Sequence, residues 1–188
     1  LYHLSMSDGD RELLLRAHAG EVVRDWTDAR PMHEKNDGTF EGGRFLYYEG
    51  ENPGWPEKSL QWEYEWAANA LETIRGETRS PEELIVDNVH PPTPVVTKGL
   101  TQVALGAPQS VYNGGLNQGV LRYFDDPSRR PGLPSDVAAL VDELNADRVG
   151  VHLVNLDRNN PKTVIIQAGM YGQHKITSGD YGEGESVR

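Results

Sequence analysis

The sequence contains no cysteine, which excludes disulfide bonds, thiolate metal sites and cysteine nucleophiles. It also lacks any run of about 18 apolar residues, so no membrane span is expected. No basic and apolar signal peptide precedes the fold. These absences leave the localisation open.

Basic residues are scarce, with 18 Lys and Arg against 29 Asp and Glu and a net charge of −11. Nucleic-acid surfaces need clustered Lys and Arg to neutralise phosphates, so no nucleic-acid partner is expected and neutral or cationic ligands fit better. Neither the H-E-x-x-H zinc motif nor the G-x-S-x-G nucleophile motif is present. We therefore expect no cofactor and no metal, and we treat His152 and His174 as ordinary strand residues.

A length of 188 residues with 37% hydrophobic and 25% charged residues is typical of a globular protein with one large domain or two small ones. The chain starts at Leu1 without a methionine, and a capped helix follows within seven residues. This start favours a processed chain, a fragment, or one subunit of a larger assembly.

The first half is predicted to be helical. Ser7 is expected to cap a helix whose apolar face contains Leu15, Ala19, Val22 and Trp26. A long polar connection over residues 27–44 leads to a second helix, from Pro56 to Gly76. Ser80-Pro81-Glu82-Glu83 has the form of a capping box and predicts a short third helix.

The proline cluster His90-Pro91-Pro92-Thr93-Pro94 marks the expected boundary to a β-rich second half. We predict strands at 95–105, 119–124, 148–156, 163–168 and 173–177, with a hairpin turn at 157–162. Ser135 is predicted to cap a helix because Val137, Leu140, Val141 and Leu144 keep helical spacing.

The predicted fold class is therefore α+β, with an N-terminal helical segment followed by an antiparallel β-sandwich-like unit that carries one helix. The expected organisation is a helical segment over residues 1–90, a β unit over residues 91–178 and a flexible tail over residues 179–188.

The segment from Phe45 to Glu57 combines four aromatic rings and three carboxylates around a Gly/Pro-bent loop. Flat rings stack on sugar faces, carboxylates accept hydrogen bonds from hydroxyl groups, and a carboxylate pair suits acid/base glycoside chemistry. The candidate catalytic residues are Glu49 and Glu51. The candidate substrate-binding residues are Tyr47, Trp55, Glu57 and His33. In the alternative interpretation, Leu46, Tyr48 and Trp55 staple the loop to a helical core while the glutamates face solvent.

The layout resembles the C-terminal portion of bacterial carbohydrate-active enzymes in which an (α/α) toroid precedes an antiparallel β-sandwich, as in several glycoside hydrolases and polysaccharide lyases. The resemblance rests on residues 48–57 with the helix that follows, and on the β-type segments 151–156 and 163–169. It implies a carbohydrate ligand but matches no catalytic motif residue by residue. It also implies that most of the catalytic domain lies on another chain or in a part of the protein outside this sequence, because at most three helices are expected before the joint.

The leading hypothesis is a subunit or C-terminal fragment of a carbohydrate-active enzyme of the glycoside hydrolase or polysaccharide lyase type. One alternative is a non-catalytic partner subunit that docks through the aromatic helix of Trp62, Tyr64 and Trp66. The other is a stand-alone sugar-binding module, which would bind without turnover.

Overall fold

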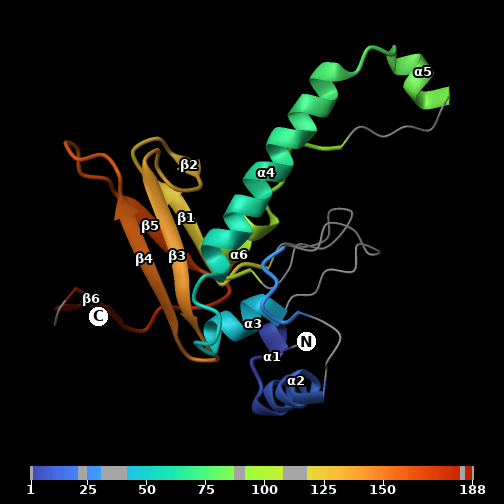
Figure 1. Cartoon of the computed structure of the whole chain (residues 1–188). Helices are drawn as coiled ribbons and strands as arrows, with labels where there is room; N and C mark the ends of the chain where they lie inside the picture. The colour runs from blue at the N-terminus through green and yellow to red at the C-terminus, as the bar shows by residue number, and fades with distance from the viewer. Residues whose placement is uncertain are drawn as a thin grey trace. The chain divides into compact units, whose positions relative to one another are not determined.

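The computed structural model confirms the α+β layout, with helices in the N-terminal half and antiparallel strands in the C-terminal half (Figure 1). It describes residues 2–20, 25–30, 42–86, 92–107, 118–182 and 185–187. By contacts the chain divides into two compact units. One comprises residues 20–100, and the other combines residues 1–19 with residues 101–188.

The helices confirm most of the predicted helical pattern. They are α1 (Tyr2–Ser5), α2 (Asp8–Gly20), α3 (Gly42–Tyr48), α4 (Trp55–Gly76), α5 (Pro81–Val86) and α6 (Lys98–Leu105). Ser7 caps α2, since its hydroxyl oxygen accepts a hydrogen bond from the Asp10 amide at 3.3 Å. Ser80 and Glu83 form the predicted capping box of α5. The predicted apolar face was expected to reach Trp26, but α2 ends at Gly20 and Trp26 lies buried in a turn of the segment 25–30, while Val22 lies outside the described residues.

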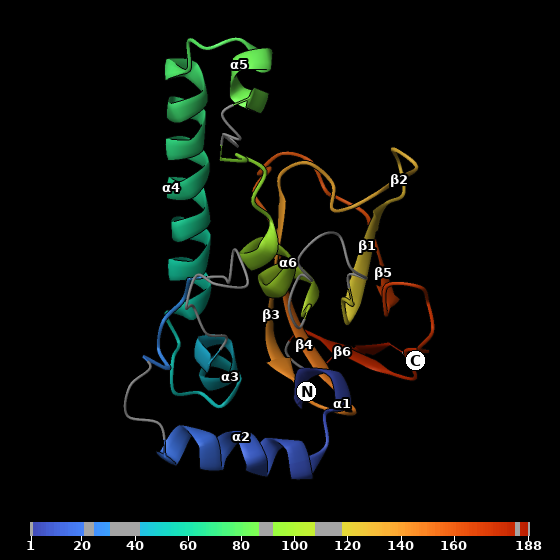
Figure 2. The same cartoon turned by 90° about the vertical axis from the view of Figure 1, so that its right-hand side faces the viewer.

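In the unit of residues 20–100, the long helix α4 follows α3 after a short connection, as Figure 2 shows. The apolar core of this unit contains Trp26, Ala29, Phe45, Leu46, Trp55 and Ala70. Asn52 ties the segment 25–30 to α3, because its side-chain amide donates to the carbonyl oxygens of Thr27 and Gly43, both at 3.2 Å. Gly43 allows this close approach, since a Cβ there would collide with the carbonyl oxygen of Asp28.

The described strands of the other unit form three small antiparallel sheets. One has the order β2 (Arg130–Pro131), β1 (Leu121–Asp125), β5 (Val164–Ala168). The second pairs β3 (Val137–Leu144) with β4 (Val149–Asn155), and the third pairs β6 (Gly179–Tyr181) with β7 (Glu185–Val187). The core of this unit includes Val103, Ala107, Leu121, Tyr123, Val141 and Leu144. The segment 179–188, predicted to be a flexible tail, thus contains the β6–β7 ladder.

The predicted helix after Ser135 is wrong, because residues 137–144 form strand β3. The ladder with β4 shifts register between Val141 and Glu143, which places an extra residue, Asp142, in the strand. The extra residue puts the buried Val141 and Leu144 three positions apart. A bulged strand therefore reproduces the spacing that suggested a helix.

Three further local predictions are wrong. The predicted strand at 95–105 is instead helix α6 from Lys98, whose buried residues Gly99, Gln102 and Val103 have helical spacing. Residues 173–177 form no strand. The 157–162 turn exists but closes no hairpin, because β4 pairs with β3 and β5 pairs with β1.

Candidate functional site

The aromatic and acidic segment that the sequence singled out is partly helical and partly a well-ordered turn. Gly50 has φ of +81° just after α3, and its amide donates to the Tyr47 carbonyl at 3.0 Å. The Glu51 amide donates to the Leu46 carbonyl at 2.8 Å. These two bonds form a Schellman motif, which ends α3 and sets the direction of the chain toward α4.

The rings of this segment pack on one another. Trp55 is only 3% exposed, and its ring lies 5.5 Å from that of Tyr47, which in turn lies 5.2 Å from the ring of Tyr48. The guanidinium of the buried Arg44 lies over the Tyr48 ring, 5.3 Å from its centroid. Trp55 therefore presents no open face for a sugar, in line with the stapling interpretation.

The predicted carboxylates have different surroundings. Glu51 and Glu57 are exposed, and Glu49 is half-buried at the end of α3. A general acid in a glycosidase needs a dry cleft that holds it close to a second carboxylate. The catalytic roles of Glu49 and Glu51 stay predictions, and His33 lies outside the described residues.

A different group of side chains lines a hollow of about 270 Å³ in the same unit. We call it the Trp62 hollow, and its lining residues are Asp25, Thr27, Asp28, Ala29, Arg30, Lys58 and Trp62. The segment 25–30 supplies most of them, and α4 supplies Lys58 and Trp62. The hollow thus combines one large ring with two carboxylates and two cationic groups.

Two local turns fix the carboxylates of the hollow. The Asp25 carboxylate accepts hydrogen bonds from the Thr27 hydroxyl at 2.7 Å and the Thr27 amide at 2.9 Å. These bonds, with smaller contributions from Lys58 and Arg30, lower the pKa of Asp25 and keep it ionised. Arg30 donates to both oxygens of Asp28, with Nε at 2.8 Å and Nη2 at 2.6 Å from Oδ2.

The ring of Trp62 is oriented by its neighbour one helical turn further along. The rings of Trp62 and Trp66 are stacked, with centroids 5.4 Å apart and an interplanar angle of 21°. Trp66 is held in turn, because its indole N–H donates to the Thr93 carbonyl at 3.2 Å. The hollow therefore has a supported aromatic wall and fixed polar groups, which together suit a small ligand with one apolar face and several hydroxyl groups.

Sequence reasoning missed this hollow because it considered Trp62 only as part of a possible docking helix and named no site residue among residues 25–30. A local signal exists in the two Asp residues at positions 25 and 28, because Asp favours Asx-turns, in which its carboxylate accepts from the backbone amide two residues later, as Thr27 and Arg30 donate here. The pairing of this segment with Trp62 depends on Asn52 and Gly43, which no local pattern indicates.

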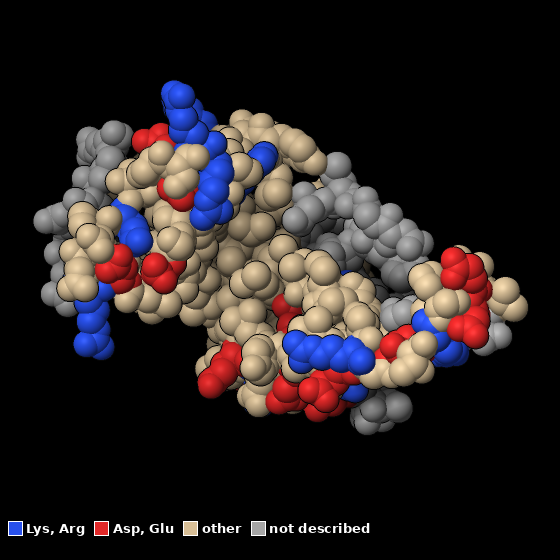
Figure 3. Space-filling view, turned by 90° about the horizontal axis from the view of Figure 1, so that it is seen from above, with Lys and Arg blue, Asp and Glu red and all other residues tan. Residues whose placement is uncertain are grey.

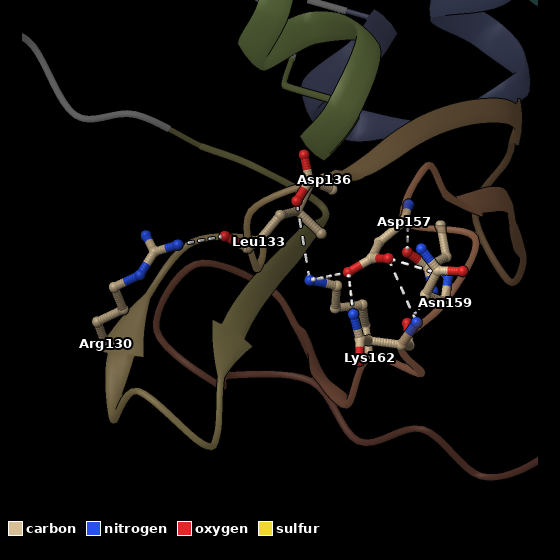
Figure 4. Close-up of polar contacts among 8 residues, drawn as sticks. Arg130, Leu133, Asp136, Asp157, Asn159 and Lys162 are labelled. Carbon is tan, nitrogen blue, oxygen red and sulfur yellow. Dashed lines mark hydrogen bonds and ion pairs between the residues drawn. The ribbon is translucent and has the colours of Figure 1, made fainter.

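A second polar cluster lies in the other unit, around the turn between β4 and β5 (Figure 4). The Lys162 ammonium group lies 3.3 Å from an oxygen of Asp157 and 3.8 Å from one of Asp136. The Asn160 side chain and the Asn159 amide also donate to Asp157, and these hydrogen bonds lower its pKa to about 2. The donors satisfy the carboxylate within the turn, so we assign the cluster a structural role.

Charge on the surface is mixed. On the face drawn in Figure 3, Lys and Arg side chains lie among Asp and Glu side chains and form no continuous basic area. Across the described ranges, no three or more His, Cys, Asp or Glu residues gather as a metal ion would need. None of the described helices combines the length and apolar composition that a membrane crossing requires.

Comparison with known proteins gives one match. The model of a family described as a domain of unknown function, DUF8034, matches residues 1–101. No curated protein and no solved structure matches the chain. The matched segment includes every residue of the Trp62 hollow.

Proposed function

Since this chain belongs to the DUF8034 family, to which no function is assigned, we propose from its geometry that it binds carbohydrate at the Trp62 hollow. In this proposal it is the sugar-binding part of a carbohydrate-active protein. The observation that carries the proposal is the supported Trp62 ring, which lies beside hydrogen-bonding groups fixed in a hollow.

The lining favours a neutral sugar. The carboxylates of Asp25 and Asp28 are matched by the cationic groups of Arg30 and Lys58, so the hollow carries no strong excess of either sign. The apolar face of a pyranose ring stacks on Trp62, and its hydroxyl groups donate to Asp25 and accept from Lys58. The ring supplies affinity and the polar groups supply orientation.

The test is calorimetric titration of the full chain with a panel of neutral oligosaccharides. Trp62→Ala should weaken binding by about tenfold, equivalent to about 1.4 kcal/mol. Tyr64→Ala is the matched control, because Tyr64 is 76% exposed on the same helix and does not line the hollow. The proposal fails if no sugar binds, or if Trp62→Ala binds as tightly as the unaltered chain.

Whether the protein also cleaves a sugar is a separate question, and it concerns the segment from Phe45 to Glu57. If Glu49 and Glu51 act in acid/base chemistry, Glu49→Gln and Glu51→Gln should abolish the release of reducing ends while leaving stability unchanged. Binding without turnover in the unaltered chain would instead favour a sugar-binding module.

A second candidate function, docking on a partner polypeptide, is favoured by the apolar surface of α4 and α5. Large apolar side chains there are exposed, with Ile85 at 78% and Val86 at 83%. Tyr64, Leu71 and Ile74 on α4 are exposed as well. Such surface marks interaction sites in soluble proteins. Paired Ile85→Ser and Val86→Ser substitutions should reduce binding of a hydrophobic dye, and unchanged dye binding would count against this surface as the docking site.

A further inference from the structure

Among the residues that the structure describes, strand β4 is paired along one edge and open along the other. Figure 1 shows β3 and β4 running side by side, and β3 is the only described element that contacts β4. The Leu156 amide donates to the Asp136 carbonyl at 2.7 Å, and the Asn145 amide donates to the Arg148 carbonyl at 3.0 Å. Because hydrogen-bonding groups alternate along an antiparallel strand, even-numbered residues of β4 face β3. The N–H and C=O groups of residues 149, 151, 153 and 155 therefore face the open edge.

This edge lacks the features that normally keep strand edges apart. Natural edges carry charged residues, proline or bulges that prevent pairing with another chain. Residues 149–156, Val-Gly-Val-His-Leu-Val-Asn-Leu, contain no Lys, Arg, Asp, Glu or Pro. By contrast, β3 contains Asp142, Glu143 and the bulge. Leu153, Val154 and Leu156 are 39%, 50% and 65% exposed, so apolar surface accompanies the open hydrogen-bonding groups.

We propose that β4 pairs antiparallel with β4 of a second copy of this chain, so that two β3–β4 ladders form one continuous four-stranded sheet. A two-fold axis perpendicular to the sheet brings odd-numbered residues of one copy opposite odd-numbered residues of the other. With the axis at His152, Val151 lies opposite Leu153 and Val149 lies opposite Asn155. All the outward-facing groups of β4 then find partners.

A second copy suits this edge because of charge. At a net charge of −11, two copies repel each other wherever their carboxylates meet. Residues 149–156 bring no carboxylate to the contact. His152 is the only titratable side chain among them, and its Nε2 lies 2.6 Å from Asp142 of the same chain.

The first test measures the mass of the full chain by light scattering over a range of concentrations. The expected mass is twice the monomer mass of 20.9 kDa. Leu153→Pro removes an N–H that faces the open edge and spares the β3 ladder, so it should abolish the dimer while keeping the circular dichroism spectrum. His152→Lys places a cation of each copy directly opposite the same cation of the other copy, and it should also give monomer. His174→Lys, outside the strand, is the matched control.

The second test determines the register. Because the chain has no cysteine, His152→Cys introduces a single thiol. Opposed residues that are not hydrogen-bonded to each other have Cα atoms about 4.5 Å apart, which lies within the range of disulfide geometry. Mild oxidation should therefore link His152→Cys into a covalent dimer, whereas Ser128→Cys, in an exposed turn, should stay monomeric. A monomer at every concentration, or a dimer that Leu153→Pro leaves intact, would overturn the proposal.

Discussion

Glu63 supplies a buried cap for another helix, and its loss should destabilise the protein measurably. Glu63 is 5% exposed on α4, and its carboxylate accepts hydrogen bonds from the amides of Gly99 at 2.6 Å and Leu100 at 3.0 Å. These amides belong to the first turn of α6, where backbone N–H groups have no partner within the helix. The negative charge also faces the positive end of the helix dipole.

The structure sets the size of the effect. A hydrogen bond to a charged group contributes about 1.5–3 kcal/mol, and loss of a helix cap costs about 0.5–2 kcal/mol. Glu63→Gln keeps one acceptor oxygen but turns an NH₂ group toward the second amide, so about 2 kcal/mol should be lost. Glu63→Ala removes both bonds and should cost about 3 kcal/mol.

Urea unfolding measures this loss, since about 2 kcal/mol lowers the midpoint by roughly 1 M for a typical dependence on denaturant. Hydrogen exchange adds a local measurement. In the Glu63 variants, the amide protons of Gly99 and Leu100 should exchange faster than in the unaltered chain, while the amide protons of the strands should change less. Glu65→Gln is the matched control, since Glu65 is exposed on the same helix. If Glu63→Gln shifts the midpoint no more than Glu65→Gln does, the carboxylate is not acting as a cap and the reasoning is refuted.

Three further predictions concern single sites. Gly99→Ala should lower the melting temperature of the protein, although replacing Gly by Ala within a helix usually stabilises it by about 1 kcal/mol. The reason is that a Cβ at Gly99 would lie 2.5 Å from Ser59 Oγ and 3.2 Å from the Glu63 carboxyl group. A higher melting temperature would contradict the close packing at this position. Tyr123→Phe should cost about 1 kcal/mol in urea unfolding, since the buried hydroxyl donates to the Ala104 carbonyl at 2.8 Å. Burial raises the pKa of Tyr123 above 10, so the stability it confers is complete below pH 10 and is lost as the pH rises further; this alkaline loss should be absent in the Phe variant. The pKa of Asp157 is lowered to about 2, so its stabilisation is present above pH 3.8 and is lost as the pH falls toward 2; an NMR titration midpoint near 4 would contradict the hydrogen bonding drawn in Figure 4.

Helix signals that depend only on neighbouring residues were predictable. Ser7, Pro56 and Ser80 mark helix starts through capping and proline geometry, which act within one turn. Helix α3 was not predicted, because it begins with Gly42 and Gly43, which are poor helix formers, and its first turn is held by the Asn52 side chain. The confirmed helices are therefore those whose ends the chain specifies locally.

The strand pairing could not be predicted from runs of β-type residues. The sequence predicts strands at 119–124, 148–156 and 163–168, and these exist as β1, β4 and β5 with slightly different bounds. Pairing of β4 with β3 depends on the bulge at Asp142, which gives the strand helix-like spacing. Helix α6 was missed for the opposite reason, since the cap at its first turn comes from Glu63, more than thirty residues earlier.

The candidate site shows the same limit of local patterns. The sequence indicated an aromatic and acidic segment, but several of its rings pack on one another, and Trp55 is buried. The Trp62 ring lines a hollow together with the segment 25–30, and Asn52 helps to hold that segment by donating a hydrogen bond to the Thr27 carbonyl. The proposed ligand class thus comes from composition, whereas the proposed location of the site required the tertiary structure.

The two proposals occupy different parts of the chain and can fail independently. Every residue of the Trp62 hollow lies in the unit of residues 20–100 and within the DUF8034 match, whereas β4 belongs to the other unit and lies beyond the match. A Trp62→Ala variant that stays dimeric and a Leu153→Pro variant that still binds sugar would separate recognition from assembly. If Leu153→Pro also weakened sugar binding, each sugar would contact both copies, because avidity raises affinity without new contacts only when two linked sites engage one ligand.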